Sequence, residues 1–183
     1  MPDFKILSLD GGGIRGVYPA AFLDYIQQRT PDPLHEYFDM IVGTSTGSII
    51  ALALALGKST GEILDLYKTK SSKIFRKRIG WLNLGLLIPK YSNKNLITEL
   101  KNLYGDCVLN DCKVRVCIPT IDIVNGKTVV RKTRHLPEWQ NDFVRPIWKV
   151  AAESSAAPGY FPAFEDSNSC QFLDGGLWAN NPT

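Results

Sequence analysis

The chain has 183 residues, of which 44% are apolar and 21% charged, and its formal net charge is +3. These values are typical of one globular domain with a core large enough to enclose a pocket. The charge is too small to indicate a nucleic-acid partner, and neither an arginine-rich arm nor an RNA-binding signature is present. The longest apolar run, residues 49–56, is too short to span a membrane, and no secretory signal is visible. We therefore expect a cytoplasmic protein whose contact with any membrane is peripheral.

The first part of the chain reads as two strand–turn–helix units. Residues 4–9 are apolar and rich in strand formers, and residues 17–29 follow a glycine loop with apolar side chains at helical spacing. Residues 39–42 form a second short apolar run, and a helix-like stretch at 48–56 comes almost directly after it. This βαβα order predicts an α/β fold with a sheet layered by helices.

The second part adds further helices and an antiparallel element. Residues 93–104 and 144–157 have helical patterns, and Pro158-Gly159 ends the second of them. Asn125-Gly126 separates two strand-like runs, 115–124 and 127–133. Because both residues of an Asn-Gly pair tolerate positive φ, this pattern predicts a β-hairpin.

Gly43-x-Ser45-x-Gly47 fits the pattern of a nucleophile elbow. A nucleophilic serine must project from a sharp strand-to-helix turn, and glycines two residues to either side let that turn close. The helix that follows points its N-terminal amides to where negative charge would develop. The sequence around Ser45 therefore predicts a nucleophile; the alternative is a glycine-rich turn that caps a helix.

A glycine loop, residues 10–16 (DGGGIRG), lies between the first strand and the first helix. Backbone N–H groups at such a position can bind a phosphate or the oxyanion of acyl transfer. Gly11, Gly13 and Gly16 also fit the G-x-G-x-x-G pattern of dinucleotide-binding proteins. That alternative requires an acidic residue at the end of the second strand, whereas Asp39 precedes the strand.

A conventional serine triad needs a histidine, and the sequence offers no well-placed one. His35 precedes the serine, and His135 lies in a polar stretch, so we expect both to be surface or structurally satisfied residues. Asp174 follows the short apolar step Phe172-Leu173 and precedes two glycines. It could take a proton directly from Ser45 if burial raised its pKa above the ordinary value of about 3.9; otherwise it caps a turn.

The cysteine spacing argues against a metal site. No two cysteines form a C-x-x-C pair, so we expect no zinc and predict buried free thiols. The cysteines are Cys107, Cys112, Cys117 and Cys170.

The tract from residue 66 to residue 98 has no acidic residue but contains eight lysines or arginines. Six basic residues lie between Lys68 and Arg78, and an apolar group follows them. We hypothesise that this tract contacts an anionic lipid surface; the alternative is a solvated helix face followed by a core-packing loop. The residues concerned are Lys68, Lys70, Lys73, Arg76, Lys77, Arg78, Trp81, Leu82, Leu84, Leu86, Leu87 and Ile88.

Taken together, the motifs resemble those of the patatin-like phospholipase family. The resemblance rests on DGGGIRG at 10–16, GTSTG at 43–47 and DGG at 174–176, in the family's order and at similar separations. AAPGYFP at 156–162 and NNP at 180–182 also match it. The resemblance implies a three-layer α/β fold over residues 5–183, with a central, mostly parallel sheet and helices on both faces.

The resemblance further implies a Ser–Asp dyad that works without histidine, metal or cofactor. It assigns the nucleophile to Ser45, the base to Asp174, and the oxyanion hole to the amides of Gly11, Gly12 and Gly13, with Arg15 nearby. The implied substrates are phospholipids or other acyl lipids. Because family members usually continue past the Asp-Gly-Gly motif, the resemblance also implies a domain cut short at its C-terminal end. A catalytically silent binding or storage domain of the same fold is the alternative.

Overall fold

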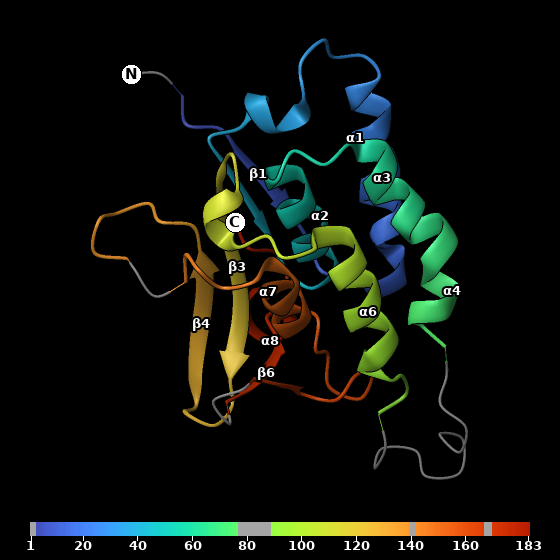
Figure 1. The fold of residues 1–183 in the computed structure, drawn as a ribbon, viewed down its shortest axis with the longest axis vertical. Helices are drawn as coiled ribbons and strands as arrows, with labels where there is room; N and C mark the ends of the chain where they lie inside the picture. Colours follow the sequence, from blue (N-terminus) through green and yellow to red (C-terminus); the bar gives the residue numbers. More distant parts are fainter. Residues whose placement is uncertain (1–2, 77–88, 140–141, 167–169) are drawn as a thin grey trace.

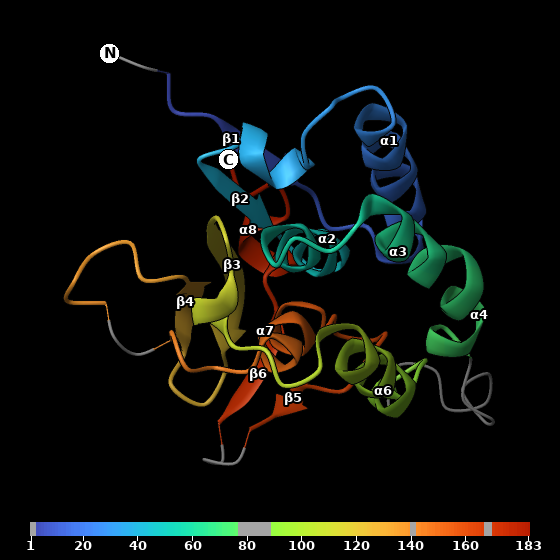
Figure 2. The ribbon, with the colours of Figure 1, turned by 45° about the horizontal axis from the view of Figure 1, so that its top comes forward.

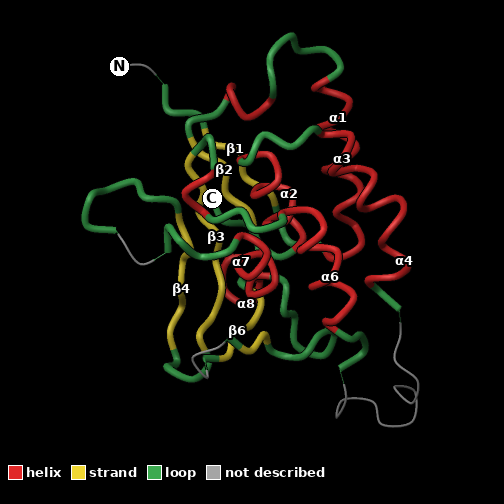
Figure 3. The backbone as a smooth tube through the Cα atoms, in the orientation of Figure 1, coloured by secondary structure: helices red, strands yellow, loops and turns green. Residues whose placement is uncertain are grey.

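The computed structural model describes residues 3–76, 89–139, 142–166 and 170–183 (Figure 1). In this part of the chain, helices pack against one mixed β-sheet (Figure 3). The strands are β1 (Ile6–Leu9), β2 (Met40–Gly43), β3 (Arg115–Asp122), β4 (Lys127–Lys132), β5 (Phe164–Glu165) and β6 (Gln171–Asp174). The α-helices are α1 (Val17–Gln27), α2 (Thr46–Ala55), α3 (Thr60–Asp65), α4 (Ser71–Ile74), α6 (Asn93–Tyr104), α7 (Ile147–Ser154) and α8 (Gly176–Ala179).

The strand order is β1-β2-β3-β6-β5. Strands β2 and β6 pair with the same edge of β3, β2 near its start and β6 near its end, and β4 pairs with the opposite edge. Strands β1, β2 and β3 are parallel, whereas β4 and β6 run antiparallel to β3. Because β5 is antiparallel to β6, it has the same direction as β3. The predicted α/β class with a mostly parallel sheet is therefore confirmed. So is the hairpin, in which Gly126 has a φ of +63° between β3 and β4.

Helices α2 and α7 form the layer next to the sheet, and α3 and α6 lie farther from it (Figure 2). Every residue of α2 is buried, because the helix has the sheet on one side and other helices around it. This position explains why residues 49–55 are apolar on all sides.

The two faces of the sheet differ in burial. The register places Leu7, Ile41 and Val116 on one face, where Ile41 and Val116 are fully buried beneath the helices. On the opposite face Ile6 is 52% exposed and Met40 is half-buried. The resemblance implied helices on both faces of the sheet, whereas in Figure 2 α1, α2, α3, α4, α6 and α7 lie on one side of it. The short helix α8 contacts β3. Strand β3 pairs with β2 up to Cys117 and with β6 from Thr120 onward.

Several element boundaries differ from the sequence prediction. The predicted helix at 144–157 is shorter, because Pro146 has extended backbone angles and α7 begins only after it. The helix predicted at 48–56 starts two residues earlier, inside the serine turn. Helix α3 was not predicted, although Ser59 and Glu62 form a capping box at its start.

A buried charge network joins the hairpin to α7. The Glu153 carboxylate is fully buried and accepts hydrogen bonds from Arg131 Nε and Arg145 Nε, each at 2.8 Å. The other members of the network are Asp142, Asp166 and Lys149. Glu153 therefore fixes the last turn of α7 relative to β4.

Replacing Glu153 with alanine should destabilise the fold strongly, because two partly buried guanidinium groups would lose their common partner. Removing one member of a buried ion pair typically costs about 3–5 kcal/mol in the free energy of unfolding. Urea unfolding followed by circular dichroism measures this cost. The control is Lys58→Ala, which removes the exposed Lys58–Glu62 pair and should cost less than about 1 kcal/mol. Equal costs for the two variants would contradict a structural role of the network.

Candidate active site

Ser45 lies in a sharp turn between β2 and α2. Its backbone angles are φ 54° and ψ −124°, and it is the one non-glycine residue with positive φ in the described ranges. A Cβ atom on Gly47 would overlap the carbonyl oxygen of Leu9, and one on Gly43 would overlap the backbone of Gly47. The two glycines therefore let β1, β2 and α2 approach closely, and the turn holds Ser45 in a conformation that L-residues rarely adopt.

The two threonines beside Ser45 bond to the other motifs of the sequence. The Thr44 hydroxyl donates to the carbonyl oxygen of Ala179 in α8, at 2.6 Å. The Thr46 hydroxyl donates to the carbonyl oxygen of Gly13 in the glycine loop, also at 2.6 Å. The serine turn is thus bonded on one side to the segment after Asp174 and on the other to the glycine loop.

Ser154, at the end of α7, holds the backbone of Ser45. Its fully buried hydroxyl accepts a hydrogen bond from the Ser45 N–H at 3.0 Å and donates to the Pro119 carbonyl at 2.8 Å. This residue was not predicted from the sequence. The available signal was the polar pair Ser154-Ser155 at the end of an alanine-rich helix.

Asp174, at the end of β6, is 5% exposed and lines the same cavity as Ser45. The N–H of Gly176 donates to Asp174 Oδ1 at 2.7 Å. Burial raises the pKa of this carboxyl, while the Ser45 side chain and the Gly176 N–H oppose the rise. The sheet thus brings together the two side chains that the sequence singled out, although they belong to distant parts of the chain.

The glycine loop lies beside Ser45 at the end of β1. The N–H of Gly11 donates to the carbonyl oxygen of Asn180 at 3.1 Å, so this predicted oxyanion donor already has a partner. Within the described residues the N–H groups of Gly12 and Gly13 have no protein acceptor. Arg15 is exposed, and its Nε lies 3.5 Å from the carbonyl oxygen of Gly12.

A cavity of about 640 Å³ is lined by Ser45, Asp174 and residues 11–15 of the glycine loop, which supply polar groups to its wall. Its other walls are mainly apolar and aromatic, with Ile49, Phe75, Tyr91, Leu96, Tyr160 and Phe161 among them. A pocket of this size and composition is suited to a ligand with one reactive polar group and an apolar body.

The histidines and the acidic residue Asp39 lie elsewhere. His35 is buried, and His135 bonds to Thr133 at 3.0 Å; neither lines the cavity. Asp39 precedes β2 and accepts a bond from the Lys5 N–H, at the end of the strand opposite to the serine turn. Asp39 therefore cannot be the carboxylate that a dinucleotide-binding site requires at the end of the second strand.

The cysteines are free and half-buried. Burial raises the pKa of the Cys112 thiol to about 12. Within the described ranges, no three cysteine, histidine or acidic side chains gather as they would around a metal ion.

The structure describes only part of the basic tract. Lys73 pairs with the buried carboxylate of Glu99 at 2.6 Å, so this lysine has a structural contact. Lys77, Arg78, Trp81, Leu82, Leu84, Leu86, Leu87 and Ile88 lie outside the described residues.

Comparison with known proteins identifies the family. The sequence profile of the patatin-like phospholipases, described as "Patatin-like phospholipase", matches residues 7–183. The chain belongs to this family. It is 36% identical over 193 residues to the cGAMP-activated phospholipase of Escherichia coli (strain TW11681), an alignment that covers 100% of this chain and 54% of that protein. Patatin-like protein 1 of Arabidopsis thaliana is 33% identical over 205 residues, with 97% of this chain and 49% of that protein covered.

This patatin-like chain thus spans about half the length of the curated relatives it matches. Among solved structures, VipD from Legionella pneumophila superposes with a TM-score of 0.65 at 13% identity, covering 96% of this chain and 46% of that chain. At this identity the likeness supports the fold alone. Among the described helices, none combines the length and apolar character that a membrane crossing requires.

The raised pKa of Asp174 predicts how stability depends on pH. Because the folded-state pKa exceeds the unfolded value of about 3.9, the ionised carboxylate destabilises the folded state increasingly as pH rises from that value through the folded-state pKa. Asp174→Asn should therefore raise the free energy of unfolding at neutral pH, and the gain should vanish below the unfolded pKa. Urea unfolding across this pH range measures the difference.

Asp122 is the matched control. Its bonds from Asn125 and Val124 lower its pKa, so Asp122→Asn should destabilise the protein at neutral pH. If both substitutions destabilise the protein equally at neutral pH, burial does not dominate the ionisation of Asp174.

Proposed function

We propose that this chain is the catalytic part of a lipid acyl hydrolase that cleaves fatty acyl esters through Ser45 and Asp174. The observation that supports the proposal most directly is that Ser45 and the buried carboxyl of Asp174 line one cavity whose other walls are mainly apolar. Family membership and relatives named as phospholipases favour a phospholipid or another acyl lipid as substrate.

In the proposed reaction, Ser45 Oγ attacks the ester carbonyl while Asp174 takes the hydroxyl proton. The oxyanion would be stabilised by the N–H groups of Gly12 and Gly13, which have no acceptor among the described residues, close to the positive charge of Arg15. The protonated Asp174 then returns its proton to the leaving alcohol, such as a lysolipid. A water molecule, deprotonated by Asp174, then attacks the acyl carbonyl, and Asp174 passes the proton to Ser45 Oγ as the bond to the acyl group breaks and the fatty acid leaves.

The alternative is a patatin-fold domain that binds a ligand without catalysis. A fluorophosphonate separates the two, because it forms a stable adduct only with an activated serine. We expect labelling of the wild type and complete loss of labelling in Ser45→Ala, read by intact-protein mass spectrometry. Ser48→Ala is the matched control, because Ser48 lies three residues after Ser45, in the first turn of α2, and its hydroxyl donates to the Ser45 carbonyl. An unlabelled but folded wild type would favour the silent domain.

The pH profile tests the role of Asp174 as the base. Only the ionised carboxylate can accept a proton, so kcat/KM should fall at acid pH with an apparent pKa above the ordinary aspartate value of about 3.9. A water-soluble ester such as p-nitrophenyl butyrate avoids interfacial effects, and circular dichroism at each pH excludes unfolding. An acid limb at or below the ordinary value would argue against a buried carboxylate base.

Contact with a membrane surface is part of this proposal, since the proposed substrates reside there. Lys68 and Lys70 are exposed at the described start of the basic tract and support such a peripheral contact.

A further inference from the structure

The apolar part of the large cavity leads from Ser45 toward α6. Ile49 lies one helical turn beyond the start of α2, and Phe75, Leu96 and Phe161 continue the lining. Ile49, Leu96 and Phe161 are each at most 6% exposed. Aromatic contacts join Phe75 to Phe161 and to Tyr91, with ring centroids 6.0 and 5.5 Å apart. This apolar part of the cavity, here called the arm, is lined by packed side chains and begins beside Ser45.

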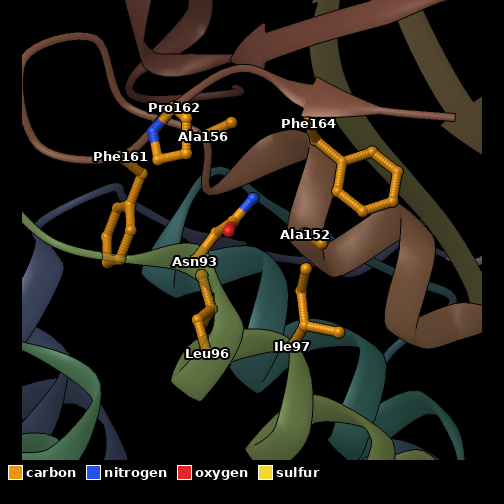
Figure 4. Close-up of a pocket in the computed structure, with 8 residues that line it drawn as sticks. All are labelled: Asn93, Leu96, Ile97, Ala152, Ala156, Phe161, Pro162 and Phe164. Atoms are coloured by element: carbon orange, nitrogen blue, oxygen red, sulfur yellow. The ribbon is translucent and has the colours of Figure 1, made fainter. Parts of the chain in front are cut away.

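Two small cavities adjoin the arm. The first, of about 10 Å³, is shown in Figure 4; it lies between α6, α7 and the segment that contains Phe161 and Phe164. The second, of about 20 Å³, lies between α6 and the helices that precede it, with Ile74 and Leu100 in its lining. Each volume is close to that of a single water molecule, so neither holds a ligand by itself.

Leu96 is the residue that lines all three cavities. Phe161 is shared by the large cavity and the first small one, and Ile49 and Phe75 are shared by the large cavity and the second. The Leu96 side chain therefore stands where the three spaces meet. A shorter side chain at this position would join them, and a bulkier one would shorten the arm.

The backbone of Leu96 is held firmly. Ser92 caps the start of α6, and the Asn95 side chain donates to the Lys73 carbonyl at 2.9 Å. One turn beyond Leu96, Glu99 pairs with Lys73. Because these contacts hold the helix on both sides of Leu96, we expect the size of this side chain to set the length of the arm.

We propose that the acyl chain of the substrate extends from Ser45 along this arm and that Leu96 determines the chain length accepted. This proposal rests on the proposed hydrolase function and specifies its substrate. Burial of each further methylene group should improve binding roughly fourfold, until the chain reaches Leu96. Chains longer than the arm must leave part of their length outside it and do not gain from the added groups.

The test compares kcat/KM for p-nitrophenyl butyrate, octanoate, laurate and palmitate. Leu96→Ala should move the optimum toward longer chains, and Leu96→Phe should move it toward shorter ones. Leu109→Ala is the control: this fully buried leucine lines none of the three cavities, so the optimum should not move.

A second measurement needs no catalysis. In the Ser45→Ala background, octanoate, laurate and palmitate should raise the thermal unfolding midpoint in an order that changes with the residue at position 96. If the wild type hydrolyses the esters but neither Leu96 variant moves the optimum, the proposal for Leu96 is wrong and the hydrolase function stands. If no ester is hydrolysed but the fatty-acid order follows position 96, the acyl site stands and the hydrolase function fails.

Discussion

The close contact between Gly47 and the end of β1 is the constraint on which the site depends. Because α2 begins against the Leu9 carbonyl, the chain must reverse within the few residues after β2, and Ser45 takes positive φ. A side chain at Gly43 or Gly47 would separate these elements. The same contact places the glycine loop, which follows β1, beside the serine. One backbone approach thus sets both the direction of the Ser45 side chain and its distance from the amides of the glycine loop.

Strain at Ser45 persists only if the surroundings hold it, and the structure does so through three partly buried hydrogen bonds. Thr44, Ser45 and Thr46 are bonded to α8, α7 and the glycine loop respectively. Helix α7 is in turn fixed to the hairpin through Glu153, the residue before Ser154. The charge network lies outside the cavity, yet it positions the hydroxyl that holds the Ser45 backbone.

Much of this arrangement could be predicted from the sequence, because its signals are local. The strand–turn–helix units, the Asn-Gly hairpin and the turn around Ser45 each follow from a few adjacent residues. Ser154 and Leu96 could not be found in this way, since their roles depend on packing between distant segments. The hydrogen bond from the Gly11 N–H could not be predicted either, because its acceptor is the backbone carbonyl of Asn180, and every residue has such a group. The start of α7 was predicted too early, because it is set by the non-helical backbone angles of Pro146.

A dyad without histidine makes a particular demand on its surroundings. An exposed aspartate is too weak a base near neutral pH, so the proposed reaction requires burial, which raises the pKa but destabilises the folded state once the carboxyl ionises. The Ser45 side chain and the Gly176 N–H oppose the rise, and the bond from Gly176 keeps the carboxylate oriented. The apolar arm contributes to the same balance, since a bound acyl chain would exclude further water from the carboxylate and strengthen its basicity. Binding of the lipid and activation of the serine would then be linked through one property, the dryness of the cavity.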